Sequence, residues 1–343
     1  MTRLTEIVEN AFLRDYSPKA FINLTVLKQN VENIKGIVGT KLCAVVKADA
    51  YGHGLCRVAE EIQPLVDRFA VASLYDASSL RIAGVEKPII CLLPVADIAA
   101  AVRWNVEISV VDREDFERII SFVQATGVKP SIHFAVNTGM NRFGYDQTNV
   151  LKNDVLRAEK LGLNVVGVFS HFYNSADYES TRRQYKKFEY FAETVKNIFP
   201  DALAHIAASG AAGYGEFNAD MVRIGMLMYG YKPVNGTFSV NPVMKVFAYA
   251  GQCRHVASGS NLLYGDYKIK SDEDISLLSY GYFDGLDDYL GLNGSCMNIT
   301  AVKGRSRLVE VSKNLENIAA ANGKGIYKTL IDLGRVREKI YYK

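Results

Sequence analysis

The chain has 343 residues, of which 49% are hydrophobic and 22% are charged, the composition of an ordinary folded globular protein. Its formal net charge of +3 comes without a basic cluster, which argues against a nucleic-acid-binding protein. No apolar run approaches the roughly 18–20 residues that span a bilayer, and acids occupy the N-terminal stretch where a signal peptide needs an apolar core. We therefore expect a cytoplasmic protein that does not enter a membrane. The five cysteines are dispersed without a C-x-x-C pair, which favours reduced thiols over disulfides or a zinc site.

Three short patterns precede the main part of the chain. Residues 1–16 are predicted to form an amphipathic helix, with Leu4, Ile7, Val8, Ala11 and Phe12 on one face and Pro18 after its end. Residues 21–24 are typical of a short strand. Apolar residues at spacings of three and four predict a helix over 26–38.

From residue 42 onward, apolar runs alternate with segments of helical periodicity. The runs are 42–46, 69–73, 88–93, 106–111, 131–136, 164–170, 203–208 and 221–229. Strands that alternate with helices of 10–15 residues indicate right-handed βαβ units and a parallel sheet. Eight such units suit a closed (β/α)8 barrel of the TIM type. The alternative is a doubly wound open sheet, but no G-x-G-x-x-G sequence follows the first strand to support a dinucleotide site.

The pattern changes near residue 236. Turn sequences at 235–236, 258–260 and 293–294 separate short candidate strands at 246–250, 275–280 and 307–311. Residues 315–321 are expected to be helical, and 327–333 and 338–342 to form a closing strand pair or a helix. The sequence thus predicts an N-terminal helical extension (1–16), a (β/α)8 barrel that binds a cofactor (17–236) and a mostly β C-terminal domain (237–343).

Lys47 ends the first apolar run and is followed by Asp49, Tyr51, Gly52 and His53. A lone lysine at the end of a strand is usually a rim residue that reaches water. However, the carboxyl ends of parallel barrel strands are also where active sites assemble. Polar sequences follow four further runs in the same way, at 137–144, 170–174, 205–211 and 223–230.

The residue types at these strand ends suit one ligand. A lysine can form a Schiff base with an aldehyde, and the turns at Ser209-Gly210 and Ile224-Gly225 can offer backbone N–H groups to a phosphate. Tyr51 can add a hydroxyl donor. Pyridoxal 5'-phosphate carries both an aldehyde and a phosphate, so we expect it as the cofactor. A metal site is not expected.

An ordered set of motifs resembles the alanine racemase family of fold-type III pyridoxal-phosphate enzymes. The motifs are AVVKADAYGHG (44–54), NTGMNRFG (137–144), SHF (170–172), HIAAS (205–209), VRIG (222–225), MYG (228–230), LYG (263–265), GYFDG (281–285), CM (296–297), and Tyr327 ahead of LGRV (333–336). The resemblance covers most of the chain. It implies racemisation of alanine by two bases, D-amino-acid supply for cell-wall biosynthesis, and a homodimer with shared active sites.

The resemblance also implies roles for single residues. Lys47 is expected to hold the cofactor and act as one base, and Tyr264 of the partner subunit is expected to act as the opposite base. Arg223 should face the pyridine nitrogen, supported by His205, and His171 should bond to Tyr264. The expected phosphate ligands are Tyr51, Ser209, Ile224, Gly225 and Tyr327. The expected substrate ligands are Arg142, Met297 and Tyr282.

Three positions depart from the family pattern. Ala135 replaces a lysine that commonly orients the arginine equivalent to Arg142, and Asn137 and Asn298 replace acids. Arg142 must therefore be held by an anion, by Asn137, or by nothing. These departures keep two alternatives open: a racemase of serine, lysine or a broad range of amino acids, and a cofactor-binding homologue with weakened catalysis. A decarboxylase is a further possibility, but Tyr264 argues against it.

Overall fold

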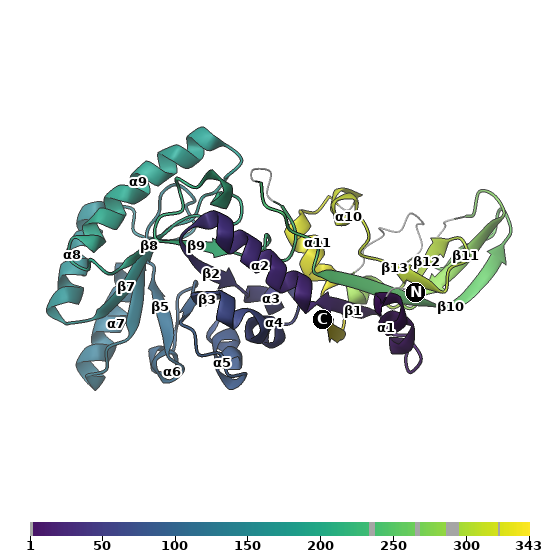
Figure 1. Cartoon of the computed structure of the whole chain (residues 1–343), viewed down its shortest axis with the longest axis horizontal. Coiled ribbons are helices and arrows are strands. Elements are labelled where there is room, and N and C mark those ends of the chain that lie inside the picture. The colour runs from purple at the N-terminus through teal and green to yellow at the C-terminus, as the bar shows by residue number, and fades with distance from the viewer. Residues whose placement is uncertain (1–2, 233–236, 265–267, 286–294, 322) are drawn as a thin grey trace. The chain divides into compact units, whose positions relative to one another are not determined.

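The computed structural model describes residues 3–232, 237–264, 268–285, 295–321 and 323–343, and it divides into two compact units (Figure 1). Unit 1 comprises Met1–Thr25, Tyr51–Gly54 and Pro242–Lys343. Unit 2 comprises Val26–Ala50 and Leu55–Asn241. The domain boundary expected at 236 stays a prediction, because residues 233–236 lie outside the described residues.

Unit 2 contains a sheet of eight parallel strands. They are β2 (Lys41–Val45), β3 (Arg68–Val71), β4 (Ile89–Cys91), β5 (Val106–Val110), β6 (Ser131–Ala135), β7 (Asn164–Phe169), β8 (Leu203–His205) and β9 (Met221–Ile224). Their order is β8-β7-β6-β5-β4-β3-β2-β9, and a parallel bridge between Ala208 and Arg223 joins its two ends. Each predicted run overlaps one of these strands, so the predicted (β/α)8 barrel is confirmed.

Helices alternate with these strands, and Figure 1 shows α7, α8 and α9 outside the strands. They are α2 (Leu24–Val38), α3 (Lys47–Gly52), α4 (Leu55–Ile62), α5 (Leu74–Ile82), α6 (Ile98–Arg103), α7 (Arg113–Thr126), α8 (Thr148–Lys160) and α9 (Tyr178–Lys196), with 3-10 turns η1 (Gln63–Leu65) and η2 (Ala212–Tyr214). The sequence marks several starts with capping side chains. Ser73, Asp97, Asp112 and Asp177 each accept a hydrogen bond from a backbone N–H of the first turn.

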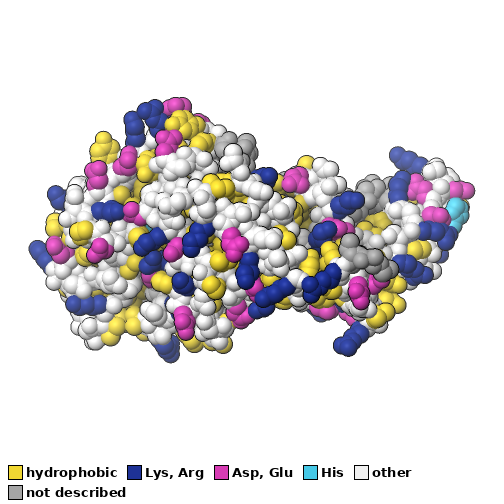
Figure 2. Space-filling model, viewed as in Figure 1, with side chains coloured by type: hydrophobic (Ala, Val, Ile, Leu, Met, Phe, Trp, Pro, Cys, Tyr) yellow, Lys and Arg dark blue, Asp and Glu magenta, His cyan; other side chains and the backbone are white. Residues whose placement is uncertain are grey.

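The surface of unit 2 carries both signs of charge. Figure 2 shows basic and acidic side chains interspersed on this face. Unit 2 contains ion pairs such as Arg157–Glu117 at 2.6 Å and Lys196–Asp220 at 2.6 Å. No described helix is long and apolar enough to cross a membrane.

Unit 1 contains a six-stranded sheet. Its strands are β1 (Lys19–Asn23), β10 (Met244–Val256), β11 (Glu273–Leu278), β12 (Thr300–Lys303), β13 (Leu308–Glu310) and β14 (Glu338–Tyr342), in the order β12-β11-β10-β1-β14 with β13 beside β10. The predicted strand at 21–24 is therefore not part of the barrel. It pairs antiparallel with β10 and parallel with β14.

Helix α1 (Arg3–Ala11) packs on this sheet through Val8, which forms a buried cluster with Phe21 and with Phe12, the residue after the helix. The remaining helices are α10 (Leu315–Ala321), α11 (Ile326–Leu333) and the 3-10 turn η3 (Tyr282–Asp284). The segment 327–333 is thus a helix and 338–342 a strand. Strand β12 was not predicted. The turns expected at 235–236 and 293–294 lie outside the described residues.

Candidate active site

Lys47 lies two residues after the end of β2 and opens an unusual turn. Ala48, Asp49, Ala50 and Tyr51 all have φ between 52° and 55°, the left-handed region that costs an L-residue about 1–2 kcal/mol. The turn is held at both ends, since Ala50 N donates to Val46 O at 2.8 Å and Leu55 N donates to Asp49 Oδ1 at 2.8 Å. Strain of this kind is concentrated at functional sites.

The charge environment of Lys47 favours a neutral amine. Burial lowers the pKa of Lys47 below that of an ordinary lysine, and the positive charges of Arg142 and Arg223 lower it further. These three cations belong to three different strand ends of unit 2, after β2, after β6 and within β9. The barrel therefore brings together the lysine and both arginines that the sequence analysis singled out.

Arg223 is buried and donates in several directions. Its Nη1 contacts His205 Nδ1 at 2.7 Å and His205 O at 2.9 Å. Its Nη2 donates to Ser170 O at 2.6 Å and Ile206 O at 3.1 Å, and it contacts His171 Nδ1 at 3.1 Å. Among the described residues, Nε–H has no acceptor. The guanidinium is thus fixed through both terminal nitrogens, and its Nε–H remains as an unused donor among the described residues.

Both histidines beside Arg223 are neutral acceptors. Burial lowers the pKa of His171 to about 3, and Arg223, Arg142 and Lys47 add to this effect. Burial and Arg223 also hold the pKa of His205 well below its usual range. An arginine can only donate, so His171 accepts at Nδ1 and carries its proton on Nε2. That N–H group is available to a further partner.

Arg142 lies in the loop after β6, and Asn137 shapes this loop rather than holding the arginine. Asn137 Oδ1 accepts from Gly139 N and Asn141 N, both at 3.0 Å, and its Nδ2 donates to Asn141 Oδ1 at 2.9 Å and Asp146 Oδ1 at 2.8 Å. Arg142 itself stacks 4.7 Å from the centre of the Phe143 ring. No described carboxylate pairs with it.

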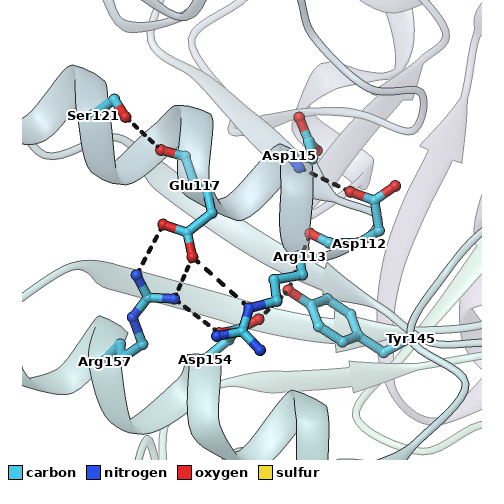
Figure 3. Close-up of polar contacts among 8 residues, drawn as sticks. All are labelled: Asp112, Arg113, Asp115, Glu117, Ser121, Tyr145, Asp154 and Arg157. Atoms are coloured by element: carbon cyan, nitrogen blue, oxygen red, sulfur yellow. Dashed lines mark hydrogen bonds and ion pairs between the residues drawn. The ribbon is translucent and has the colours of Figure 1, made fainter.

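The far end of the same loop is anchored by Tyr145. Figure 3 shows Tyr145 pointing toward Asp154 of α8. The hydroxyl donates to Asp154 Oδ2 at 3.0 Å and lies 3.1 Å from Asp112 O, while Tyr145 N donates to Ala135 O at 3.0 Å. A pocket of about 10 Å³ lies beneath the loop, lined by Ala135, Arg142, Phe169 and His171 among others. The backbone of the loop is therefore fixed although its arginine has no partner of opposite charge.

The turn after β9 has the form of an anion cradle. The backbone N–H groups of Gly225 and Leu227 donate to Ser209 Oγ at 3.2 Å and 3.3 Å. The chain then turns helically, with Met228 N donating to Gly225 O. N–H groups that converge at the start of a helical turn bind phosphate well. Ser209, Ile224 and Gly225 are thus brought together, as predicted for phosphate ligands, although the role itself stays a prediction.

Tyr51 and Tyr327 meet within unit 1. Their ring centres are 5.9 Å apart, although 276 positions separate them in the sequence. The contact depends on two glycines: a Cβ on Gly52 would lie 2.7 Å from the Cα of Gly334. Burial raises the pKa of Tyr51, and Tyr327 adds to this rise, so the Tyr51 hydroxyl remains a donor.

Unit 1 also brings Tyr282 and Met297 together. Tyr282 N donates to Cys296 O at 3.3 Å, and Phe283 N donates to Met297 O at 3.0 Å. Tyr264 is 80% exposed and follows Leu263, which packs against a buried cluster that includes Leu262 and Ile269. The second predicted base thus stands at the surface on an anchored segment.

Three groups in contact with this site were not anticipated as site residues. His133 Nδ1 lies 3.2 Å from His205 Nε2, and His133 in turn contacts Glu107, which pairs with Arg68. The sequence signal that could have identified them is a charged or titratable residue within or next to an otherwise apolar run. Among the described residues no cluster of His, Cys, Asp or Glu has the form of a metal site.

Comparison with known proteins finds relatives that match most of the chain. The family model "Alanine racemase, N-terminal domain" matches residues 22–233. An alanine racemase of Treponema denticola is 34% identical over 286 residues, covering 78% of this chain and 75% of that protein. One of Clostridium tetani is 30% identical and covers 94% and 91%.

Solved structures give the same result for the fold. Alanine racemase of Clostridium difficile 630 superposes with a TM-score of 0.85 at 26% identity, covering 94% of this chain and 95% of that one. The enzyme of Streptomyces coelicolor superposes with a TM-score of 0.87 at 26% identity, covering 96% and 99%.

Proposed function

The chain belongs to the alanine racemase family, and we propose that it is a pyridoxal-phosphate-dependent isomerase that interconverts L- and D-alanine by a two-base mechanism. The observation that carries the proposal is the grouping of Lys47, Arg142 and Arg223 at the strand ends of one barrel mouth, with a neutral amine favoured on Lys47. A cytoplasmic location and a homodimer remain predictions that accompany it.

The residues present fit the cofactor. The unshared Nε–H of Arg223 matches a ring nitrogen that accepts a hydrogen bond. The N–H groups of Gly225 and Leu227, which donate to Ser209 Oγ in this structure, would donate to a phosphate in its place. Tyr51 and Tyr327 would add hydroxyl donors to the phosphate. When bound through Lys47, pyridoxal phosphate would supply an electron sink that makes the Cα proton of the substrate acidic.

Lys47 would act as the base on one face of the substrate. A base near neutral pH must have a pKa below that of an ordinary lysine, and burial with two neighbouring arginines provides the required direction of shift. Lys47 Nζ would take the proton from one enantiomer and return it to form the same enantiomer. Racemisation therefore needs a second group on the opposite face.

Tyr264 is the proposed second base, contributed by the partner subunit. Its 80% exposure supports a role outside its own chain's core. The Nε2–H of His171 would donate to the Tyr264 oxygen, because Nδ1 is already occupied by Arg223. A hydrogen bond to the charged form favours that form, so His171 would help the tyrosine give up its proton.

Arg223 would control the reaction by keeping its own proton. Burial lowers the pKa of Arg223 to about 10, so the guanidinium stays protonated at neutral pH and donates rather than accepts. A ring nitrogen that receives only a hydrogen bond is a weaker electron sink than a protonated one. This would limit side reactions such as transamination.

Arg142 would bind the substrate carboxylate. It is free of carboxylate partners among the described residues, so a bound carboxylate would be its counter-charge. This same observation keeps a racemase of another amino acid, or one with weak turnover, as the alternative, because no protein group orients the guanidinium.

The decisive test is exchange of the Cα proton in D2O. The purified protein, loaded with pyridoxal phosphate, is incubated with single L-amino acids, and both deuterium incorporation and D-enantiomer are measured. We expect exchange and racemisation with alanine, and loss of both in Lys47→Ala together with the visible absorbance of the bound cofactor. Exchange with serine or lysine in place of alanine would move the substrate assignment. If the protein bound the cofactor but exchanged the Cα proton of no amino acid, it would be a cofactor-binding protein and not an enzyme.

A further inference from the structure

A chain of hydrogen bonds runs from Arg223 through the barrel interior to the amino ends of the strands. After Arg223 it passes through His205 and His133 (His205 Nε2 to His133 Nδ1, 3.2 Å) to Glu107 (His133 Nε2 to Glu107 Oε2, 3.0 Å). Nε and Nη2 of Arg68 then each donate a hydrogen bond of 2.8 Å to the Glu107 carboxylate. Arg68 begins β3 and Glu107 is the second residue of β5, whereas the candidate active site lies at the opposite, carboxyl ends.

Every bond in this chain has a fixed direction. Arg223 can only donate, so His205 accepts at Nδ1 and carries its single proton on Nε2. That proton is donated to His133 Nδ1, so His133 also carries its proton on Nε2 and donates it to Glu107. Glu107 Oε2 accepts from both His133 Nε2 and Arg68 Nε, and Oε1 accepts from Arg68 Nη2. Each donor meets one acceptor, and both histidines are neutral Nε2–H tautomers.

The anion at the end of the chain is stable. Burial raises the pKa of Glu107, but the hydrogen bonds from His133 and Arg68 outweigh this and lower it to about 2. Glu107 is therefore an obligatory acceptor at neutral pH. An acceptor at this position is what forces the proton of His133 onto Nε2.

The backbone around His133 is adapted to its ring. A Cβ on Gly167 of β7 would lie 2.5 Å from His133 Nδ1, so a glycine is required for the imidazole to reach its place. The register between β6 and β7 also shifts between Ile132 and His133. His205 is further held by stacking on Phe169, with ring centres 5.3 Å apart and planes within 9°.

We propose that Arg68, Glu107 and His133 are positioning residues that hold His205 in the tautomer that accepts from Arg223, and thereby fix Arg223 with its Nε–H unshared among the described residues. The consequence for catalysis rests on the proposed function, because it assigns that N–H to the cofactor ring. The tautomers themselves do not depend on it.

The first measurement is made on the protein without cofactor. Long-range ¹H–¹⁵N correlation spectra of histidine-labelled protein distinguish the two neutral tautomers from each other and from imidazolium. We expect neutral Nε2–H tautomers for His133 and His205 at neutral pH. An Nδ1–H tautomer or an imidazolium at either position overturns the proposal, whatever the protein's activity.

The second measurement uses Glu107→Gln. The amide oxygen is expected to take the place of Oε2, where it accepts from both His133 and Arg68 Nε, so that the amide NH2 faces Arg68 Nη2. His133 then keeps its proton on Nε2, but its acceptor has lost its negative charge. We expect both tautomers to be retained, and with cofactor a fall in kcat of roughly 10- to 100-fold with little change in KM for alanine.

Two further variants separate positioning from folding. Glu107→Asp keeps an anionic acceptor and should retain both tautomers and most of kcat. Asp274→Asn makes the same carboxylate-to-amide change opposite the exposed His255, 3.1 Å away, and should leave His133, His205 and kcat unchanged. Unaltered kcat and KM in Glu107→Gln would refute the positioning role. Absence of any racemase activity in the wild type would instead refute the proposed function and leave the tautomer result standing.

Discussion

The hydroxyl of Tyr145 donates a 3.0 Å hydrogen bond to Oδ2 of Asp154, a carboxylate with no solvent exposure (Figure 3). The other oxygen of Asp154 contacts Arg157 at 3.2 Å. Tyr145 ends the loop that carries Arg142, so this bond ties the loop to α8. In this chain, where Ala135 provides no side chain to orient Arg142, the loop is positioned from its backbone and its far end.

Tyr145→Phe should therefore weaken substrate binding as well as the fold. Leaving a buried carboxylate oxygen without its donor costs about 1–3 kcal/mol, and urea unfolding should show a loss of that size. KM for alanine should rise several-fold with a smaller change in kcat, because Arg142 would be less well placed. Tyr190→Phe removes a hydroxyl from a tyrosine that is 69% exposed and should change neither quantity. An unchanged KM in Tyr145→Phe would show that the Tyr145–Asp154 hydrogen bond does not contribute to substrate binding.

The pKa of Lys47 should be visible in the rate of cofactor attachment. Only the neutral amine reacts with the aldehyde, so the attachment rate should rise with pH and level off below 10.5, the value of an ordinary lysine. Arg142→Met removes one of the positive charges that disfavour the ammonium form, so its plateau should move to higher pH. Burial, the larger cause, remains. Stopped-flow measurement of the cofactor's absorbance gives the attachment rate in the wild type and in Arg142→Met.

Arg103→Met is the control for this experiment, since it removes one positive charge from an exposed position of the same unit. Its plateau should coincide with that of the wild type. If the plateau of Arg142→Met also coincided with the wild type, Arg142 would have no electrostatic effect on Lys47.

Shared active sites make a further prediction. Lys47→Ala and Tyr264→Phe should each lose racemisation by about 10²- to 10⁴-fold, the usual contribution of a general base. When the two variants are unfolded, mixed in equal amounts and refolded, half of the dimers should combine one subunit of each. Each such dimer has one site with both bases, so about a quarter of the wild-type activity should return in a two-fold symmetric dimer. No recovery in correctly refolded dimers would place both bases in one chain.

The close approach of Gly52 and Gly334 predicts a matched pair of variants. Gly52 has φ +84° and a Cβ there would meet the backbone of Gly334, whereas Gly84 has φ +83° and open space around it. Both alanine substitutions incur left-handed strain of about 1–2 kcal/mol, but Gly52→Ala adds a backbone collision, for a total of about 2–5 kcal/mol. Gly52→Ala should also weaken cofactor affinity, because it separates Tyr51 from Tyr327. Equal losses of stability in the two variants would contradict the contact.

The barrel was predictable because each strand lies in or beside a short run that is rich in apolar residues. Each of the eight runs overlaps one strand, and among the side chains expected at the carboxyl ends, Arg142 and Arg223 lie close enough to Lys47 to lower its pKa. Strand β12 was not predictable in the same way. Thr300-Ala-Val-Lys303 is four residues long and becomes a strand by pairing with β11, a partner that its own sequence does not specify.

The internal hydrogen-bond chain could not be predicted for a related reason. Val106-Glu-Ile-Ser-Val110 alternates apolar and polar residues, the pattern of a strand with one face in water. Closure of the barrel turns Glu107 and Ser109 inward instead, so both are buried. The contacts of Glu107 with Arg68 and His133 come from strands 39 and 26 positions away, and the contact of Gly52 with Gly334 joins still more distant segments.

The left-handed turn after Lys47 lowers the stability of the fold, whereas its rigidity serves the placement of the lysine. Four consecutive L-residues are held where glycine would rest without strain, and Ala48 is exposed, so Ala48→Gly would leave no cavity. Selection for heat resistance alone should therefore tend to enrich glycine here, with a gain of up to about 1 kcal/mol. The same change would loosen the segment that aims Lys47. A screen for thermostability that does not also measure turnover is thus expected to select substitutions next to Lys47, and these substitutions are expected to lower activity.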